Sequence, residues 1–340
     1  GDIVAKFPWN RWGIVSVAFS PDGRLIAIGA NDSVIRVWDL GERRLLVNLT
    51  SPVGPPRILT FAERDLLAVG TFGTVARWSV PDWSPGAPID LGIDTSRSSL
   101  SGKILVSYPK RGPVVVVDFA SGEILGRLGE GRYLGRITAT EFSPDGDLLA
   151  LGTDAGTIHL FDPSWKEAFL AEGPAGAVDS LSFSPNGGRY LIAASGGRVW
   201  IWEVGEGEAK LLRQFLAHTK PISEVDFSPE GDRFLTASWD ETVRVWDLEG
   251  KLLLSLWKAA RVEALQPLIR DATFAAAFSP RGDLIASGHE DKTVRLWELQ
   301  GKRLHILKKH WGVVWCVAFS PDGKILASGG EGGMVVLWDV

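Results

Sequence analysis

A five-residue string, Phe-Ser-Pro-x-Gly, occurs six times in this chain and constrains the fold more than any other feature. The copies start at Phe19, Phe142, Phe183, Phe227, Phe278 and Phe319, and most neighbouring copies are 41 to 51 residues apart. The long first gap holds a decayed copy at Phe61-Ala-Glu-Arg-Asp and a weaker one near Ser101-Gly102. Internal similarity at this period is typical of repeat architectures.

A second signature follows each copy by about fifteen residues: a β-branched run closed by an aromatic residue and usually an acid. The closings stand at Trp38-Asp39, Trp78-Ser79, Val117-Asp118, Phe161-Asp162, Trp202-Glu203, Trp246-Asp247, Trp297-Glu298 and Trp338-Asp339. The chain therefore divides into eight units, of which the third is degenerate.

Each unit has the pattern of four short strands. In the sixth unit, residues 222–227 alternate apolar and polar side chains, and residues 228–231 form a Pro/Gly turn. Further strands are expected at 233–238, 242–246 and 251–256. An apolar period of two, broken by Pro or Gly every ten to twelve residues, excludes helices.

On these Trp-Asp closings, and on strings such as Asp240-Glu-Thr-Val-Arg-Val-Trp-Asp247, the chain resembles the WD-repeat β-propeller family over essentially its whole length. The resemblance implies an all-β, eight-bladed propeller of four-stranded antiparallel blades, forming a single domain over residues 1–340. It also implies that the N-terminal strand, Ile3 to Phe7, pairs beside Met334 to Trp338 and closes the ring.

Composition excludes several classes of protein. Hydrophobic residues make up 45% of the chain and charged residues 23%, which is enough apolar surface for a real core. The net charge of −5 without long charge runs does not support nucleic-acid binding, and no apolar stretch is long enough to cross a membrane. A single cysteine, Cys316, excludes an intramolecular disulfide framework and cysteine-based zinc sites. We expect a cytoplasmic monomer, and the start at Gly1 without Met is expected for a processed terminus or an excised domain.

The sixth unit contains a group that imitates a catalytic Ser-His-Asp triad: His218, a hydroxyl from Thr236 or Ser238, and Asp240, all near Trp246. The resemblance assigns these residues instead to a structural tetrad of buried hydrogen bonds. By the same comparison, Ile269 stands where the seventh unit would carry the histidine, and Gly332 stands where the eighth would carry the aspartate.

No cofactor, metal site or catalytic residue is expected. The five histidines, at 159, 218, 289, 305 and 310, form no pair with metal-ligand spacing. The glycine strings at 129–135 and 329–333 are not followed by helices, so they fit strand turns better than phosphate loops.

One face of such a ring is lined by the turns between second and third strands and by the loops that precede each first strand. Partner contacts are expected there, at Trp12, Asn31, Thr71, Asp154, Trp239, Glu290, Trp311 and Glu331. An acidic side beside tryptophans suits a basic or aromatic peptide. The alternative is that these side chains only pack on adjacent loops or form an ordinary solvated rim.

The favoured function is a non-enzymatic scaffold that binds a protein or peptide, as a docking or sensor domain of a longer signalling protein. The alternative is a propeller enzyme, a hydrolase or lyase, that uses the central channel. That alternative needs carboxylates, a metal set or a reactive hydroxyl converging on the axis, and the repeats show no such convergence. An insertion at 257–273 is either a partner-contacting loop or a packing segment.

One Met, one Cys, three Gln and four Asn are few labile residues for a chain of this length. This depletion is typical of heat-adapted proteins, so we expect a thermostable protein.

Overall fold

A computed structural model describes most of the chain, and every element in the described part is a strand. The described residues are 3–6, 14–62, 65–70, 73–91, 98–101, 104–108, 113–118, 121–129, 134–173, 176–205, 208–257, 272–331 and 333–340. Within these ranges there is no helix of the length and apolarity needed to cross a membrane.

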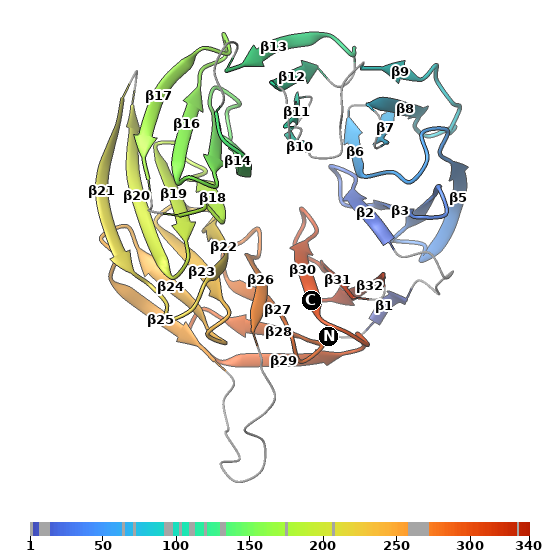
Figure 1. Ribbon diagram of the computed structural model, residues 1–340. Coiled ribbons are helices and arrows are strands. Elements are labelled where there is room, and N and C mark those ends of the chain that lie inside the picture. Colours follow the sequence, from blue (N-terminus) through green and yellow to red (C-terminus); the bar gives the residue numbers. More distant parts are fainter. Residues whose placement is uncertain are drawn as a thin grey trace.

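The strands form eight four-stranded antiparallel sheets arranged as the blades of a ring around a central axis (Figure 1). Blades 1 to 4 consist of β2 (Ile14–Phe19), β3 (Leu25–Ala30), β4 (Val34–Asp39) and β5 (Arg44–Thr50); β6 (Ile58–Ala62), β7 (Asp65–Val69), β8 (Thr74–Ser79) and β9 (Ile89–Asp90); β10 (Ser98–Ser101), β11 (Ile104–Ser107), β12 (Val114–Asp118) and β13 (Ile124–Leu128); and β14 (Ile137–Phe142), β15 (Leu149–Thr153), β16 (Thr157–Phe161) and β17 (Glu167–Glu172). Blades 5 to 8 consist of β18 (Ser180–Phe183), β19 (Tyr190–Ser195), β20 (Arg198–Gly205) and β21 (Glu208–Leu216); β22 (Ile222–Phe227), β23 (Arg233–Ser238), β24 (Val243–Asp247) and β25 (Leu252–Leu256); β26 (Thr273–Phe278), β27 (Leu284–His289), β28 (Thr293–Glu298) and β29 (Arg303–Lys308); and β30 (Val314–Phe319), β31 (Ile325–Gly330), β32 (Met334–Asp339) and β1 (Ile3–Lys6). The expected eight-bladed, all-β propeller is confirmed.

The repeated Ser-Pro-x-Gly string builds the hairpin between the first two strands of a blade. In blade 1 the Ser20 hydroxyl donates to Asp22 Oδ1 at 2.5 Å and accepts the Leu25 amide at 2.8 Å. Gly23 closes the turn at a φ of 70°, a left-handed conformation that favours glycine. The string therefore recurs because its serine, proline and glycine each satisfy one requirement of the same turn.

Apolar side chains fill the spaces between blades. The strands alternate their side chains between two faces, so the middle strands of each blade pack against both neighbouring blades. Eight clusters of buried residues result, one at each junction between adjacent blades. The cluster formed by Ile26, Ile28, Ala327, Val335 and Leu337 joins blade 8 to blade 1, so apolar packing continues across the junction of the chain ends.

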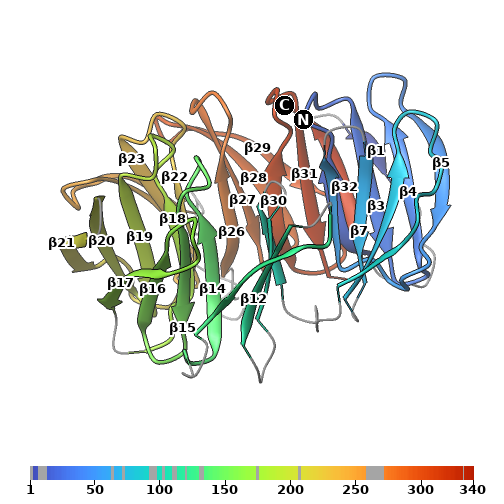
Figure 2. The ribbon, with the colours of Figure 1, turned by 90° about the horizontal axis from the view of Figure 1, so that it is seen from above.

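The N-terminal strand occupies the outer position of blade 8. β1 pairs antiparallel with β32, with Ile3 opposite Trp338 and Lys6 opposite Val336, and the two termini lie close together (Figure 2). The role of this strand as the latch of the ring stays a prediction, because the core between blades 8 and 1 also joins the two ends.

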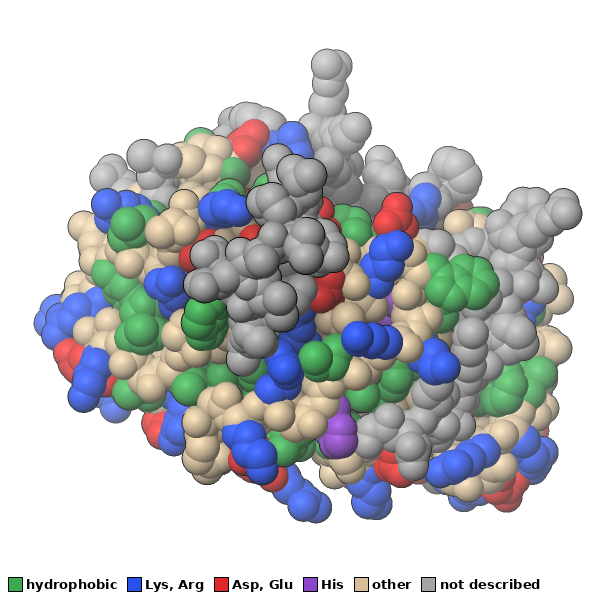
Figure 3. All heavy atoms as spheres, turned by 90° about the horizontal axis from the view of Figure 1, so that it is seen from below, with side chains coloured by type: hydrophobic (Ala, Val, Ile, Leu, Met, Phe, Trp, Pro, Cys, Tyr) green, Lys and Arg blue, Asp and Glu red, His purple; other side chains and the backbone are tan. Residues whose placement is uncertain are grey.

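The ring has two different faces. We call the face with the Ser-Pro-x-Gly turns the proline face. The opposite face carries the turns between second and third strands, including the one at Asp240, and we call it the aspartate face. On the view of the molecule in Figure 3, lysine and arginine side chains are interspersed with acidic and apolar ones, and no single sign dominates.

The innermost strands of five blades share a β-bulge just after their first residue. Their register shifts between Ile14 and Ser16, Ile137 and Ala139, Ile222 and Glu224, Thr273 and Ala275, and Val314 and Cys316. Each bulge adds one residue near the aspartate face, and bulges redirect side chains.

Candidate functional site

A chain of buried hydrogen bonds in blade 6 joins four of the residues expected to form the tetrad. The Trp246 indole donates to Thr236 Oγ1 at 2.9 Å, and that hydroxyl lies 2.6 Å from His218 Nε2. His218 Nδ1 lies 3.0 Å from the Asp240 carboxylate. Thr236 and His218 are buried, and the hydrogen-bonded group connects the inner strands and the turn of the blade.

Ser238, the alternative hydroxyl, lies outside this chain. It bonds the carbonyl oxygens of Lys220 and Pro221 at 3.2 and 2.9 Å and accepts the Asp240 amide. It therefore fixes the loop before β22 to the turn after β23.

The Asp240 carboxylate is held in its charged form. Burial alone raises its pKa, but hydrogen bonds from His218 and Thr242 outweigh burial and bring the pKa well below its ordinary value of 3.8. The negative charge is thus part of the folded network.

Blade 7 builds a similar network with a histidine from another position. His289, at the end of β27, lies 2.8 Å from Ser287 Oγ, which accepts the Trp297 indole at 3.0 Å. Ile269, where the histidine was sought, lies outside the described residues. In blade 7, His289 supplies an imidazole to the network from the position that Ser238 occupies in blade 6.

Blade 8 has the network without its acid. His310 Nε2 lies 2.7 Å from Ser328 Oγ, which accepts the Trp338 indole at 2.8 Å. Within the described part of the chain, the buried His310 Nδ1 has no hydrogen-bond partner. Burial without an acidic partner lowers the pKa of His310 to about 4.

The expected partner-contact residues lie on the aspartate face where they are described. Asn31, Asp154, Trp239, Trp311 and Glu331 are exposed, and Glu290 is half-buried; Trp12 and Thr71 lie outside the described residues. Three of the acids also bond backbone amides that precede the inner strands: Asp154 bonds Arg136, Glu290 bonds Ala272, and Glu331 bonds Val313. These acids therefore help to position the loops as well as giving the face its negative charge.

Trp239 belongs to a row of aromatic rings that crosses three blades. Its ring centroid lies 5.9 Å from that of Phe274 in blade 7, which lies 4.6 Å from that of Trp315 in blade 8. We call Trp239, Phe274 and Trp315 the aromatic row. Trp239 is 46% exposed and Trp315 52% exposed, and nearby in sequence Trp311 is 72% exposed.

Sequence reasoning missed Phe274 and Trp315. Both are the additional residues of the β-bulges that open β26 and β30. The signal available in the sequence was an aromatic residue four positions before the last Phe of an inner strand, where other units carry smaller side chains such as Ser223.

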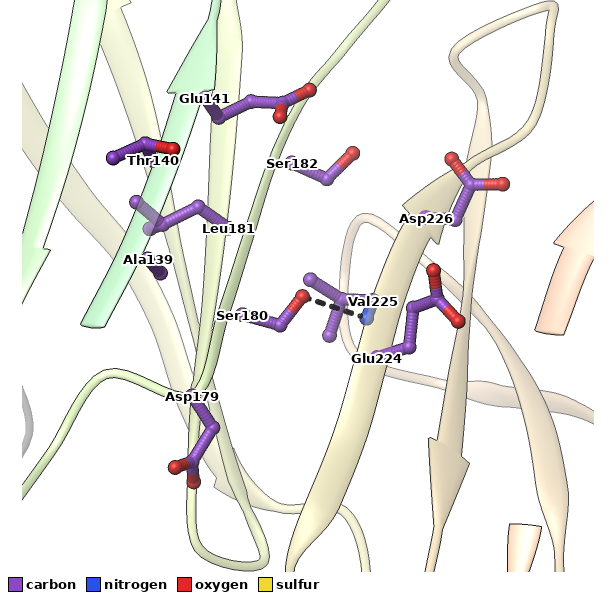
Figure 4. A pocket seen from close by; sticks show the side chains of 10 residues that line it. All are labelled: Ala139, Thr140, Glu141, Asp179, Ser180, Leu181, Ser182, Glu224, Val225 and Asp226. Carbon is purple, nitrogen blue, oxygen red and sulfur yellow. Dashed lines mark hydrogen bonds between the residues drawn. The ribbon is translucent and has the colours of Figure 1, made fainter. Parts of the chain in front are cut away.

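Carboxylates converge on the central channel, contrary to the expectation that none do: Asp179 lines the same cavity as three acids on the innermost strands of blades 4 and 6. Glu141 on β14 and Asp226 on β22 face a cavity of about 350 Å³ from two sides of Ser182, with Glu224 further along β22 (Figure 4). A second cavity of about 380 Å³ also contains Glu141 and Asp226 and opens among the prolines of the proline face. The convergence was overlooked because Glu141 comes from a different repeat than Glu224 and Asp226, and the three acids match no common motif.

These channel carboxyl groups are easier to protonate than ordinary ones. Burial raises the pKa of Glu141 and of Glu224 to about 7 and that of Asp226 to about 6. The charge of Asp226 adds to the shift of both glutamates. Groups that titrate near neutral pH are able to exchange protons with a ligand in the channel.

Two of the three also join adjacent blades. Glu224 accepts the Ala276 amide at 2.9 Å, and Asp226 accepts the Phe278 amide at 3.3 Å. Among the described residues, no group of three or more His, Cys, Asp or Glu side chains is arranged to hold a metal ion.

Comparisons with known proteins agree with this architecture. The family model described as "WD domain, G-beta repeat" matches residues 1–39, 129–162, 167–203, 209–247, 270–298 and 301–339, which together make up more than half of the chain. Pre-mRNA-processing factor 19 of Oryza sativa subsp. japonica is 26% identical over 204 residues, which cover 57% of this chain and 38% of that protein. The chain therefore spans well under two thirds of that relative's length.

Two solved structures have the same fold over the whole of both chains. The computationally designed protein Ika8 superposes with a TM-score of 0.80 at 23% identity, covering 100% of each chain. Sqt1 of Chaetomium thermophilum, bound to the N-terminus of the ribosomal protein L10, superposes with a TM-score of 0.80 at 18% identity and the same coverage.

Proposed function

Since the chain belongs to the WD-repeat β-propeller family, we propose that it is a non-enzymatic scaffold that binds a protein or peptide partner on the aspartate face. The observation that carries this proposal is the group of tryptophans exposed at one side of that face. Trp239, Trp311 and Trp315 are each about half exposed or more, whereas the tryptophans that close the strands of blades 6 to 8 are buried. Exposed aromatic clusters of this kind are typical of contact sites.

The relatives support the proposal at the level of the family. The rice relative is a pre-mRNA-processing factor, and Sqt1 shows that a ring of this fold holds a terminal segment of another protein. As part of the same proposal, the chain acts as a monomer in the cytoplasm, without nucleic-acid or membrane contacts of its own.

The second candidate is a hydrolase or lyase that uses the channel. It is favoured by one observation, the raised pKa values of Glu141, Glu224 and Asp226 around a cavity. The backbone bonds of Glu224 and Asp226 favour a structural role for two of these acids, so the scaffold remains the conclusion.

Affinity capture from lysate tests the scaffold function. The parent protein is compared with the double variant Trp239→Ala, Trp311→Ala, chosen at equal melting temperature. We expect a protein that the parent retains and the variant loses, and that binds again when both components are purified. Equal capture by both proteins would contradict a contact site at these tryptophans and direct attention to the segment 257–273.

A further inference from the structure

The aromatic row is directly next to channel carboxylates. Ser223 bonds the carbonyl oxygen of Thr273 at 2.8 Å, which fixes β22 beside the start of β26 where Phe274 lies. The next residue of β22, Glu224, bonds the Ala276 amide, two positions along β26 from Phe274. Burial raises the pKa of Cys316, the neighbour of Trp315, and the nearby charge of Glu224 adds to this shift. Glu224 therefore lies just inside the channel from the aromatic row.

Two more carboxylates lie on the outer side of the row. Glu290 bonds the Ala272 amide at 3.4 Å, and Glu331 bonds the Val313 amide at 3.4 Å. These amides precede Phe274 and Trp315 by two positions each. The row is thus bordered by acids at the aspartate face and by Glu224 toward the channel.

Glu224, Glu290 and Glu331 each have one carboxylate oxygen that can accept hydrogen bonds from a ligand. In each of Glu224, Glu290 and Glu331 the bond to the backbone uses Oε2, and no bond to Oε1 is found within the described part of the chain. The residues described around the adjoining channel cavity include Glu141, Asp179, Glu224 and Asp226 but no Lys, Arg or His. The described wall of the cavity therefore offers no cation of its own to these carboxyl groups.

We propose that the aromatic row and the carboxylates of Glu224, Glu290 and Glu331 bind an arginine side chain from an extended segment of a partner protein. The proposal rests on the proposed function and specifies its ligand. A guanidinium is planar, stacks on indole and phenyl rings, and donates in pairs to carboxylates. An acidic segment would be repelled by the same carboxylates, and an apolar segment would leave them desolvated without partners.

Fluorescence anisotropy with short labelled peptides tests this proposal. A Gly/Arg peptide is titrated with the full chain, alongside Gly/Lys, Gly/Gln and Gly/Glu peptides of equal length. We expect the Gly/Arg peptide to bind most tightly and its affinity to fall with added salt. We also expect Trp315→Ala, Glu224→Gln and the double variant Glu290→Gln, Glu331→Gln each to weaken binding by roughly fivefold or more.

Two control variants match these changes elsewhere on the surface. Leu211→Ala removes an exposed apolar side chain, 42% exposed, from the outer strand of blade 5, and Glu249→Gln removes an exposed acid from the turn after β24, on the proline face. Both should leave the affinity for the Gly/Arg peptide unchanged. In Glu224→Gln the glutamine oxygen can still accept the Ala276 amide, so the variant loses the charge and keeps this hydrogen bond. Equal melting temperatures of the variant and the parent would show that the fold is retained.

The outcomes also separate this proposal from the proposed function. Equal affinity for the Gly/Arg and Gly/Gln peptides, or an affinity unaffected by the three site variants, overturns the arginine site. If the partner in the capture experiment is still lost on Trp239→Ala, Trp311→Ala, the scaffold function stands while the arginine site fails. If neither experiment shows dependence on these residues, both proposals fail.

Discussion

Glu224 on β22 accepts a hydrogen bond from the Ala276 amide on β26 at 2.9 Å, and so joins the innermost strands of blades 6 and 7 through a side chain. Innermost strands have a free edge toward the channel, where backbone amides need partners. Asp226 does the same for Phe278, and Ser180 of blade 5 accepts the Val225 amide. Two of the acids that line the channel, Glu224 and Asp226, are therefore also part of the junctions between blades.

Glu141→Gln should stabilise the protein above neutral pH. The pKa of Glu141 rises from 4.5 to about 7 on folding. The contribution of Glu141 to the free energy of unfolding is therefore most favourable below pH 4.5, and it is lost as the pH rises through 7. Glutamine stays neutral, so the variant should exceed the parent by about 1–3 kcal/mol in free energy of unfolding near pH 8, and match it near pH 4. Urea denaturation at both pH values measures this.

The control for Glu141→Gln is Asp147→Asn, an exposed acid of the same blade. It should not reproduce the pH-dependent gain. If the parent and Glu141→Gln have the same free energy of unfolding at every pH, the Glu141 carboxyl group is solvated as on an ordinary surface.

Asp240→Ala should lower the free energy of unfolding by roughly 1–3 kcal/mol at neutral pH, because His218 and Thr242 lose a buried acceptor. The pKa of Asp240 is lowered on folding, so its stabilisation is present above pH 3.8 and is lost as the pH falls further. The difference between parent and variant should narrow accordingly in acid. Unchanged stability would show that the network in blade 6 is dispensable, and loss of an enzymatic activity through this change alone would restore the triad interpretation.

Gly332→Asp should complete the network of blade 8. Gly332 lies outside the described residues, but it stands six positions before Trp338, as Asp240 stands six before Trp246. A carboxylate there would pair with His310 Nδ1, raise the pKa of His310 above its present value of about 4, and stabilise the fold by about 1 kcal/mol. NMR titration of the His310 ring measures the shift, and an unchanged titration would contradict the equivalence of the two positions.

Deleting residues 1–7 should lower the melting temperature sharply. The deletion removes β1 and leaves the outer edge of β32 unpaired next to Trp338. Calorimetry measures the melting temperatures of the truncated chain and of the parent. If both melt at the same temperature, the core between blades 8 and 1 closes the ring without the N-terminal strand.

The intact chain should unfold above roughly 65 °C, the upper end of the range usual for mesophilic domains. The reason is its small number of labile residues, with one Met, one Cys, three Gln and four Asn. A melting temperature between about 45 and 65 °C would contradict this expectation.

Six of the eight blades could be read directly from the sequence because each of the six carries its own copy of the turn string. A single string determines the turn at Ser20 and its five counterparts, and the alternating strands around it leave little freedom of register. The blade 6 network was equally accessible, except for the choice between Thr236 and Ser238. That choice depends on which of two residues, on the same side of β23, lies closer to the Trp246 indole.

The remaining features depend on contacts between repeats. Phe274 and Trp315 meet because two separate blades each carry a bulge at the same level of the ring. Glu141 and Asp226 meet across Ser182 because blades 4 and 6 face the same channel. Neither relationship is visible in one unit, and both follow only when the closed ring sets the distances between units.

The eight clusters lie between blades, so no hydrophobic core belongs to a single blade. Each sheet contributes residues to the two clusters on its two sides. Leu235 of blade 6 and Phe278 of blade 7, for example, lie in the same cluster. A substitution in one blade is therefore felt by its neighbours, and unfolding of one sheet exposes apolar surface on two others. A blade can therefore be added to the ring or removed from it only where the two surfaces that then meet match each other.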